Sequence, residues 1–315
     1  MTAPATSGRW RLGLSLALLT CLFWATLPAA LKISLEVIEP MTLPWFRFFC
    51  AFVFTAILLA ARGKFAGLHG LGRLRWQLLF IAAVGLIGNY ILFLLGLKYT
   101  TPANAQVLIQ SAPLMLAIGS IIVFKESVSR GQIAGFLAIA VGLSLFAFEQ
   151  REKSVAAASY GFGAALIFLA AISWVLYALI QKKLLARLGS QQIMLVLYLI
   201  ATLALLPFAH FSNFAGIDSM HWWAIGYCAV NTIGAYGAFA EAFVHWEASR
   251  VSAVLAVTPI MTVSVIGVLA PLMPTHLSPE RIGSWGWLGT GLVVSGSIFA
   301  ALLKRKPPAL LSEQQ

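Results

Sequence analysis

Charged residues are what this sequence has least of. Only 10% of its 315 residues are charged and just ten are acidic, whereas 60% are hydrophobic and the mean hydropathy is +0.90. A water-soluble domain needs a charged shell to stay dissolved, so this shortage excludes an ordinary soluble fold. Lipid must form part of the surroundings of the chain.

Catalytic and metal-binding motifs are missing as well. The sequence contains no nucleophile elbow, phosphate loop, HExxH or paired CxxC. Its three cysteines, Cys21, Cys50 and Cys228, lie in apolar segments without metal-ligand spacing. His210 and His221 fall in a short polar connection and predict no metal set. We therefore expect no enzyme, no cofactor and no metal, and an intramembrane enzyme would need a reactive pair that we do not find.

Long apolar segments are what the sequence has instead. A helix needs about 20 apolar residues to cross a hydrocarbon layer of about 30 Å, and these segments are far longer than barrel strands. They predict an all-α membrane protein with ten transmembrane helices. The segments are Leu12–Ile33, Thr42–Ala61, Trp76–Leu97, Pro102–Phe124, Gly131–Phe148, Tyr160–Leu185, Ile193–Phe208, Trp222–Trp246, Ser252–Leu272 and Gly286–Leu303. The first is longer than the core of a secretory signal, so we expect it to be retained as a span.

The basic residues predict the orientation of these spans. With the N-terminus inside, fifteen of the twenty-one Lys and Arg residues fall on the cytoplasmic side, where positive charge is retained. We therefore expect a protein of the inner membrane with both termini in the cytoplasm. This excess of basic residues on the cytoplasmic side, together with their attraction to anionic lipid headgroups, accounts for the net charge of +11. We therefore expect no nucleic-acid partner.

The two halves of the chain resemble each other. Three short matches keep the same order in both halves: Leu22–Ala25 with Ile172–Val175, Ile87–Tyr90 with Ile233–Tyr236, and Ala112–Leu114 with Thr258–Ile260. This predicts one five-helix repeat in residues 1–150 and a second in residues 151–315. Because five is odd, the second repeat enters the bilayer from the opposite face, so the repeats are inverted. Inverted repeats can exchange conformations and open a central site to each side in turn.

Glycine spacing adds a fourth match. Gly135 and Gly142 stand seven residues apart in the fifth segment, as do Gly289 and Gly296 in the tenth. Each pair keeps one helix face small, and a small face admits a close neighbour.

Polar and aromatic residues within the spans are the candidates for binding a substrate, because polar groups in hydrocarbon persist mainly where they face protein or water. The candidates are Trp24, Asn89, Tyr90, Gln110, Trp174, Tyr177 and Tyr236. Packing between helices is an equal alternative for the aromatic residues. Pro113 and Pro259 are expected to bend their helices and to leave a carbonyl free one turn earlier.

Two charged residues within the spans have opposite expectations. Glu241 is the one carboxylate that falls inside a predicted span, so burial would raise its pKa towards values at which it could exchange protons and couple them to transport. The alternative is that Glu241 reaches water or pairs with a nearby Lys or Arg at the cytoplasmic end. Arg47 is expected to snorkel to headgroups or to bind helix carbonyls, and binding of a substrate carboxylate is its alternative.

The segments also resemble the EamA-type permeases of the drug/metabolite transporter superfamily. The resemblance lies in Trp24, Arg47-Phe48, Leu97–Thr101 leading to Pro113, and Lys125-Glu126 followed by Gly135. The second half departs from this pattern, because the ninth segment runs into Met273–His276 and the acidic residue is displaced to Glu280. The resemblance implies ten-span carriers of amino acids, sugars or drugs, with a cavity built from spans one, three, four, six, eight and nine.

The leading functional hypothesis is an exporter of amino acids or related small metabolites. Efflux of amphipathic or cationic drugs is the alternative, favoured by the aromatic residues and by the negative charge of Glu241. A channel would need a continuous polar lining, which the scattered polar residues do not predict. The oligomeric state is not indicated.

Overall fold

The computed structural model describes residues 9–63, 70–124, 129–153, 157–185, 187–246, 251, 254–255, 257–278 and 282–302. Within these residues all regular structure is helical. The α-helices are α1 (Trp10–Ser34), α2 (Thr42–Ala61), α3 (Arg73–Lys98), α4 (Pro102–Leu108), α5 (Ser111–Phe124), α6 (Arg130–Lys153), α7 (Ala157–Leu184), α8 (Ser190–Leu205), α9 (Ser219–His245), α11 (Thr258–Leu272) and α12 (Ser284–Leu302). Two short 3₁₀ helices, η2 (Leu206–Phe208) and η3 (Phe211–Phe214), join α8 to α9.

Most predicted spans correspond to single helices. Six helices in the described part of the chain are long and apolar enough to cross a membrane: α1, α2, α3, α6, α7 and α8. α11 is a shorter apolar helix. The chain is therefore an all-α, multi-pass membrane protein. The start of the predicted ninth span at Ser252, together with Lys125-Glu126 and Glu280, lies outside the described residues.

The fourth predicted span is divided into two helices. α4 ends at Leu108 and α5 begins at Ser111, two residues before Pro113. Pro113 has no N–H to donate to the carbonyl of Ile109 four residues earlier, so a hydrogen bond that would join α4 to α5 into one helix is missing. The Ile109 carbonyl instead accepts the N–H of Ala112 at 2.9 Å. The structure thus shows an interruption where a bend was expected, and the expectation of a free carbonyl is wrong.

Pro259 stands at a helix start rather than at a bend. It occupies the first turn of α11, where its missing N–H costs little. The Leu255 carbonyl four residues earlier accepts the hydroxyl of Thr258 at 2.5 Å. The carbonyl that was expected to be free is thus satisfied here as well.

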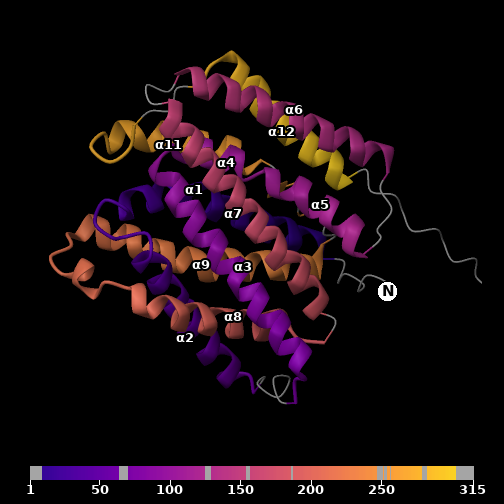
Figure 1. Cartoon of the computed structure of the whole chain (residues 1–315), viewed down its shortest axis with the longest axis vertical. Helices are drawn as coiled ribbons and strands as arrows, with labels where there is room; N and C mark the ends of the chain where they lie inside the picture. Colours follow the sequence, from indigo (N-terminus) through magenta and orange to yellow (C-terminus); the bar gives the residue numbers. More distant parts are fainter. Residues whose placement is uncertain are drawn as a thin grey trace, which may run out of the picture.

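The helices lie in a consistent order across the molecule (Figure 1). α6 and α12 pack together at one edge and α2 and α8 pack together at the opposite edge, with α1, α3, α7 and α9 between them. In this middle region α1 packs against α9, and α3 packs against α7. The largest buried apolar cluster lies where α2, α3, α7 and α8 meet.

The glycine pairs bring α6 and α12 close together. A Cβ placed on Gly135 would lie 2.6 Å from the carbonyl oxygen of Gly296, and one placed on Gly142 would lie 2.5 Å from that of Gly289. These separations are shorter than any side chain tolerates, so the two backbones touch directly. The small helix faces predicted from the spacing are therefore confirmed. The close neighbour of α6 is α12, and the contact is made by the glycine faces of both helices.

Two charged residues stabilise helix ends from neighbouring helices. Glu149 in α6 is 5% exposed, and its carboxylate accepts the N–H groups of Gly283 at 2.6 Å and Gly286 at 2.9 Å at the start of α12. The ammonium of Lys32 donates to the carbonyls of Leu97 and Thr100 at the end of α3. Both contacts place a charge at the helix end that attracts it.

Candidate functional site

A buried arginine lies beside the central group of aromatic rings. Arg47 in α2 is 3% exposed, and the carbon at the centre of its guanidinium lies 4.6 Å from the centre of the Tyr90 ring in α3. Its Nε donates to the hydroxyl of Thr232 in α9 at 2.9 Å. The Thr232 hydroxyl donates in turn to the Cys228 carbonyl at 3.0 Å. Arg47 thus points into the protein, and the expectation that it snorkels to headgroups is wrong.

Within the described residues, the Arg47 guanidinium has no carboxylate partner. Its hydrogen bond to Thr232 is its one hydrogen bond in this part of the chain, and it forms no ion pair there. A charge removed from water costs several kcal/mol when it is not compensated by a counter-charge. The stacking on Tyr90 offsets part of this cost. The positive charge of Arg47 is therefore largely uncompensated by the described part of the protein.

Four helices contribute aromatic rings to the apolar core that contains Tyr90. We call Phe48, Tyr90, Tyr177 and Tyr198 the central aromatic cluster; all four are buried in one apolar core, against which Trp174 and Tyr236 pack. The Phe48 ring centre lies 4.4 Å from that of Tyr90 and 6.0 Å from that of Tyr198. The Tyr90 hydroxyl is buried without a hydrogen-bond partner in the described structure. A polar group in this state is available to a ligand.

The predicted binding residues divide into those near this cluster and those elsewhere. Tyr90 and Tyr177 belong to it, and Trp174 contacts Tyr177 with ring centres 6.5 Å apart. Trp24 in α1 contacts Tyr236 edge-on at 6.0 Å, so these two rings extend the aromatic surface toward α1. Tyr198 was not among the predicted residues, because nothing in the local pattern of α8 indicates which neighbours its ring meets.

Asn89 and Gln110 have other surroundings. The side-chain amide of Asn89 donates to the Ala170 carbonyl of α7 at 2.9 Å, which fixes the packing of α3 on α7. Asn231 makes the equivalent contact between α9 and α1, donating to the Phe23 carbonyl at 2.6 Å. Gln110 is half-buried and lies in the interruption between α4 and α5. Asn89 therefore has a structural contact, and its predicted role in binding is weakened.

Glu241 is not buried. Its side chain is 57% exposed, and its Oε1 lies 3.2 Å from Nε2 of His245 one turn later in α9. The premise that burial makes Glu241 suitable for proton exchange is therefore wrong, and the partner is a histidine rather than Lys or Arg. Among the described residues the buried carboxylate is Glu149, which was not among the predicted site residues. Both of its oxygens accept backbone N–H groups of α12, which is a structural role.

Histidine–carboxylate contacts gather at one end of the bundle. We call this the Glu36 end: the end at which α1 finishes and α2 and α9 begin. His221 is 7% exposed and lies between Asp218 and Glu36, so a buried histidine is present although none was expected. Hydrogen bonds from the backbone and the side chain of His221 hold the pKa of Asp218 below its usual range. His210 pairs separately with Glu39 at 2.5 Å.

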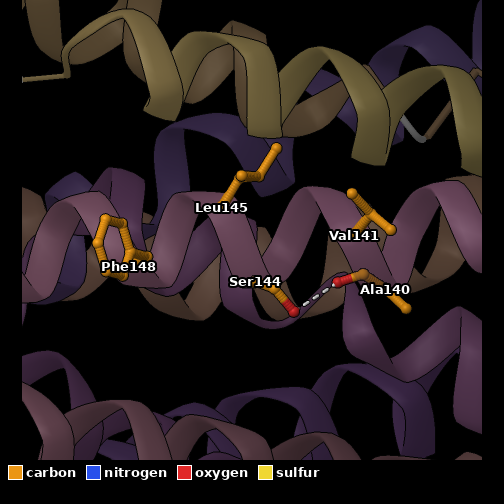
Figure 2. Close-up of a pocket in the computed structure, with 5 residues that line it drawn as sticks. All are labelled: Ala140, Val141, Ser144, Leu145 and Phe148. Atoms are coloured by element: carbon orange, nitrogen blue, oxygen red, sulfur yellow. Dashed lines mark hydrogen bonds between the residues drawn. The ribbon is translucent and has the colours of Figure 1, made fainter.

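A surface groove on α6 offers no comparable site (Figure 2). Its lining residues, Ala140, Val141, Ser144, Leu145 and Phe148, all come from one helix, and the groove is widely open. The Ser144 hydroxyl donates to the Ala140 carbonyl at 2.9 Å, so the one polar side chain is already engaged. This apolar face suits contact with lipid chains.

The apolar helices around a buried arginine and aromatic rings define a multi-pass membrane protein. The sequence model of the "EamA-like transporter family" matches the chain twice, over residues 11–148 and 161–302. The chain belongs to the EamA-like transporter family.

Its relatives carry transporter names. The sequence is 34% identical over 299 residues to "Uncharacterized inner membrane transporter YhbE" of Escherichia coli (strain K12), covering 92% of this chain and 91% of that protein. It is 32% identical over 291 residues to "Uncharacterized transporter" of Haemophilus influenzae, covering 92% and 95%. A solved structure, "Crystal structure of protein", shares the fold with a TM-score of 0.64 at 17% identity, covering 94% of this chain and 99% of that one.

Proposed function

We propose that this transporter carries small metabolites with a carboxylate group across the inner membrane, with export of amino acids or related compounds as its leading activity. The observation that carries this proposal is the uncompensated charge of Arg47. A carboxylate of the substrate would supply the missing counter-charge at a place where protein has excluded water. Tyr90 stacks beneath the guanidinium and has a hydroxyl left for the same ligand.

The alternating-access mechanism rests on the packing of the two halves. If residues 1–150 and 151–315 are inverted copies, α1 corresponds to α7 and α3 corresponds to α9. A two-fold axis would then turn the contact of α1 with α9 into the contact of α7 with α3, and both contacts are present. The two separate family matches support the same division. Arg47, Tyr90, Tyr177 and Tyr236 come from both halves, so relative motion of the halves would open their site to either side.

The orientation completes the proposal. Basic residues favour cytoplasmic termini, which places the Glu36 end outside and the end with Glu241 and His245 inside. The hypothesis that Glu241 couples transport to protons therefore concerns a residue at the cytoplasmic end of α9, paired with His245 and outside the central aromatic cluster.

Efflux of drugs is the second candidate. The rings of Trp24, Trp174 and Tyr236 are half-buried and would stack on planar groups. A cationic drug would meet the charge of Arg47, however, and like charges repel in a low-dielectric site. Arg47 and the aromatic surface together therefore favour neutral or anionic amphipathic cargo over cations.

Counterflow in reconstituted liposomes tests the proposal. Vesicles loaded with unlabelled amino acids should accumulate the labelled compound transiently and with saturation, which a channel does not do. Comparing metabolites inside and outside cells with and without the gene would identify the cargo and the direction of transport. If neither experiment detects movement of any carboxylate compound, the proposed substrate class is wrong.

Substitution of Arg47 tests the site itself. Arg47→Gln should weaken the affinity for a carboxylate substrate by about 10- to 100-fold, because it removes a charged hydrogen bond. Arg62→Gln, at the exposed end of the same helix, is the matched control and should transport normally. The wild type should also prefer a carboxylate over its amide analogue, and Arg47→Gln should lose this preference. Equal preference in both proteins would contradict the role of Arg47.

A further inference from the structure

Two connecting segments and the first turn of α9 bring metal-ligating groups together at the Glu36 end. Glu36 follows α1, His221 lies in the first turn of α9, and His276 lies between α11 and α12. One ligand atom from each of these three residues lies within 4.8 Å of the others. Oε2 of Glu36 is 3.1 Å from Nε2 of His221 and 2.7 Å from Nδ1 of His276. The two imidazole rings stand nearly perpendicular, with centres 5.5 Å apart.

Asp218 orients His221 within this cluster. As the N-cap of α9 it accepts the backbone N–H of His221 through Oδ1 at 2.9 Å. Its second oxygen, Oδ2, lies 2.8 Å from Nδ1 of the same residue. An acceptor at this position favours a proton on Nδ1 and thereby leaves Nε2 able to bind a metal ion beside Glu36. Metal-ligating histidines are usually held in this way by a carboxylate on their other nitrogen.

Nε2 of His221 and Oε2 of Glu36, 3.1 Å apart, need a proton or a metal ion between them. Without either, two electron-rich atoms oppose each other next to a histidine that is 7% exposed. A second proton on His221 or a metal ion would remove this repulsion. Nδ1 of His276 lies 2.7 Å from the same Glu36 oxygen. Protons would give two separate hydrogen bonds to this oxygen, whereas one metal ion would use all three ligand atoms at once.

The separations between the three ligand atoms are close to those around a divalent ion. Tetrahedral zinc with bonds of about 2.0–2.1 Å holds its ligand atoms roughly 3.3 Å apart. The distances of 2.7 and 3.1 Å from the Glu36 oxygen are slightly shorter. Glu36 and His276 both lie in connections between helices and are partly exposed, so they can move outward by the fraction of an ångström required. Two imidazole nitrogens and one carboxylate oxygen would leave the fourth position for water.

We propose that Glu36, His221 and His276 bind a divalent transition-metal ion, Zn²⁺ in the first instance, and that Asp218 positions His221 for this role. The bound ion links the outer ends of α1, α9 and α11, which come from both halves of the chain. It stabilises the arrangement in which these three ends lie together. This site is separate from Arg47 and does not depend on the identity of the transported substrate.

Titration calorimetry with Zn²⁺ on the detergent-solubilised, full-length protein, with any affinity tag removed, tests the site. The wild type should bind one ion per chain. His276→Ala and Glu36→Gln should each weaken binding by at least about 100-fold, and Asp218→Asn by about 10- to 100-fold. His210→Ala is the matched control: His210 also pairs with a carboxylate at the Glu36 end but has no second histidine beside it in the described structure. Its binding should equal that of the wild type.

A second measurement keeps the result independent of folding. Each variant should elute as the wild type does in size-exclusion chromatography and should melt at the same temperature in the presence of EDTA, whereas Zn²⁺ should raise the melting temperature of the wild type and of His210→Ala only. Co²⁺ should give the visible absorption of a tetrahedral site in these two proteins alone. Wild-type Zn²⁺ binding no tighter than that of His276→Ala, or equal loss in His210→Ala, would overturn the proposal.

Discussion

The contact between α6 and α12 yields a sharp prediction, because two backbones meet there without side chains between them. Replacing Gly142 by Ala places a Cβ 2.5 Å from the carbonyl oxygen of Gly289 and 2.9 Å from both Cβ of Leu292 and N of Val293. Ordinary contacts at these atoms begin near 3.4 Å. The two helices must therefore separate by up to almost 1 Å, which also loosens the contacts along the rest of their interface.

The size of the effect follows from two opposing terms. Overpacking of this kind costs about 1–3 kcal/mol, whereas Gly to Ala within a helix gains up to about 1 kcal/mol from lower chain entropy. We expect Gly142→Ala to destabilise the protein by about 1–2 kcal/mol. Gly291→Ala in α12 is the matched control, since a Cβ there meets no atom within 4 Å. This control should be neutral or slightly stabilising.

Thermal unfolding in detergent measures both variants. A thiol-reactive fluorophore reports unfolding, because Cys21 and Cys228 are buried in the folded protein. Gly142→Ala should melt at a lower temperature than the wild type, and Gly291→Ala should not. The double variant Gly142→Ala with Gly289→Ala should lose less than the sum of the single losses, because one separation of the helices accommodates both methyl groups. A melting temperature of Gly142→Ala at or above that of the wild type would refute the close contact.

Three further substitutions test other residues. Glu149→Gln should destabilise the protein by about 1–2 kcal/mol, because the neutral side chain offers a single acceptor oxygen to the two N–H groups at the start of α12. Glu39→Gln changes an exposed side chain and is the control. Equal melting temperatures of the two variants would argue against the capping role of Glu149. Tyr90→Phe should leave the melting temperature unchanged or slightly raised, since the lost hydroxyl has no partner, yet it should weaken transport; unchanged transport would remove this hydroxyl from the site. Glu241→Gln should abolish the dependence of transport on the pH gradient if the contact between Glu241 and His245 couples protons, and a retained dependence would show that the proton site lies elsewhere.

Properties that depend on one stretch of chain were predictable from the sequence. Hydrophobic length is such a property, and α2 begins and ends at the predicted residues Thr42 and Ala61. The interruption before Pro113 is another, because a missing N–H acts on the carbonyl four residues earlier whatever surrounds it. Glycine spacing predicted that α6 and α12 would each have a close neighbour, although it could not name the partner.

The directions of charged side chains required the folded structure. Arg47 and Glu241 both lie within apolar segments, and hydropathy treats them alike. Arg47 nevertheless faces Thr232 and Tyr90 in the interior, while Glu241 lies on the exposed side of α9. A rotation of about 100° per residue around a helix decides between these outcomes, and the packing of neighbouring helices determines which face is covered.

The sequence alone therefore determined that this chain crosses a membrane as helices, where most of those helices lie and which family it resembles, because these features rest on local composition and spacing. The tertiary structure decided which residues meet. Glu36, His221 and His276 are separated by 185 and 55 positions in the chain, and Arg47 meets a threonine 185 residues later. Contacts of this kind arise only when whole helices pack, since no local pattern records the partner of a distant side chain.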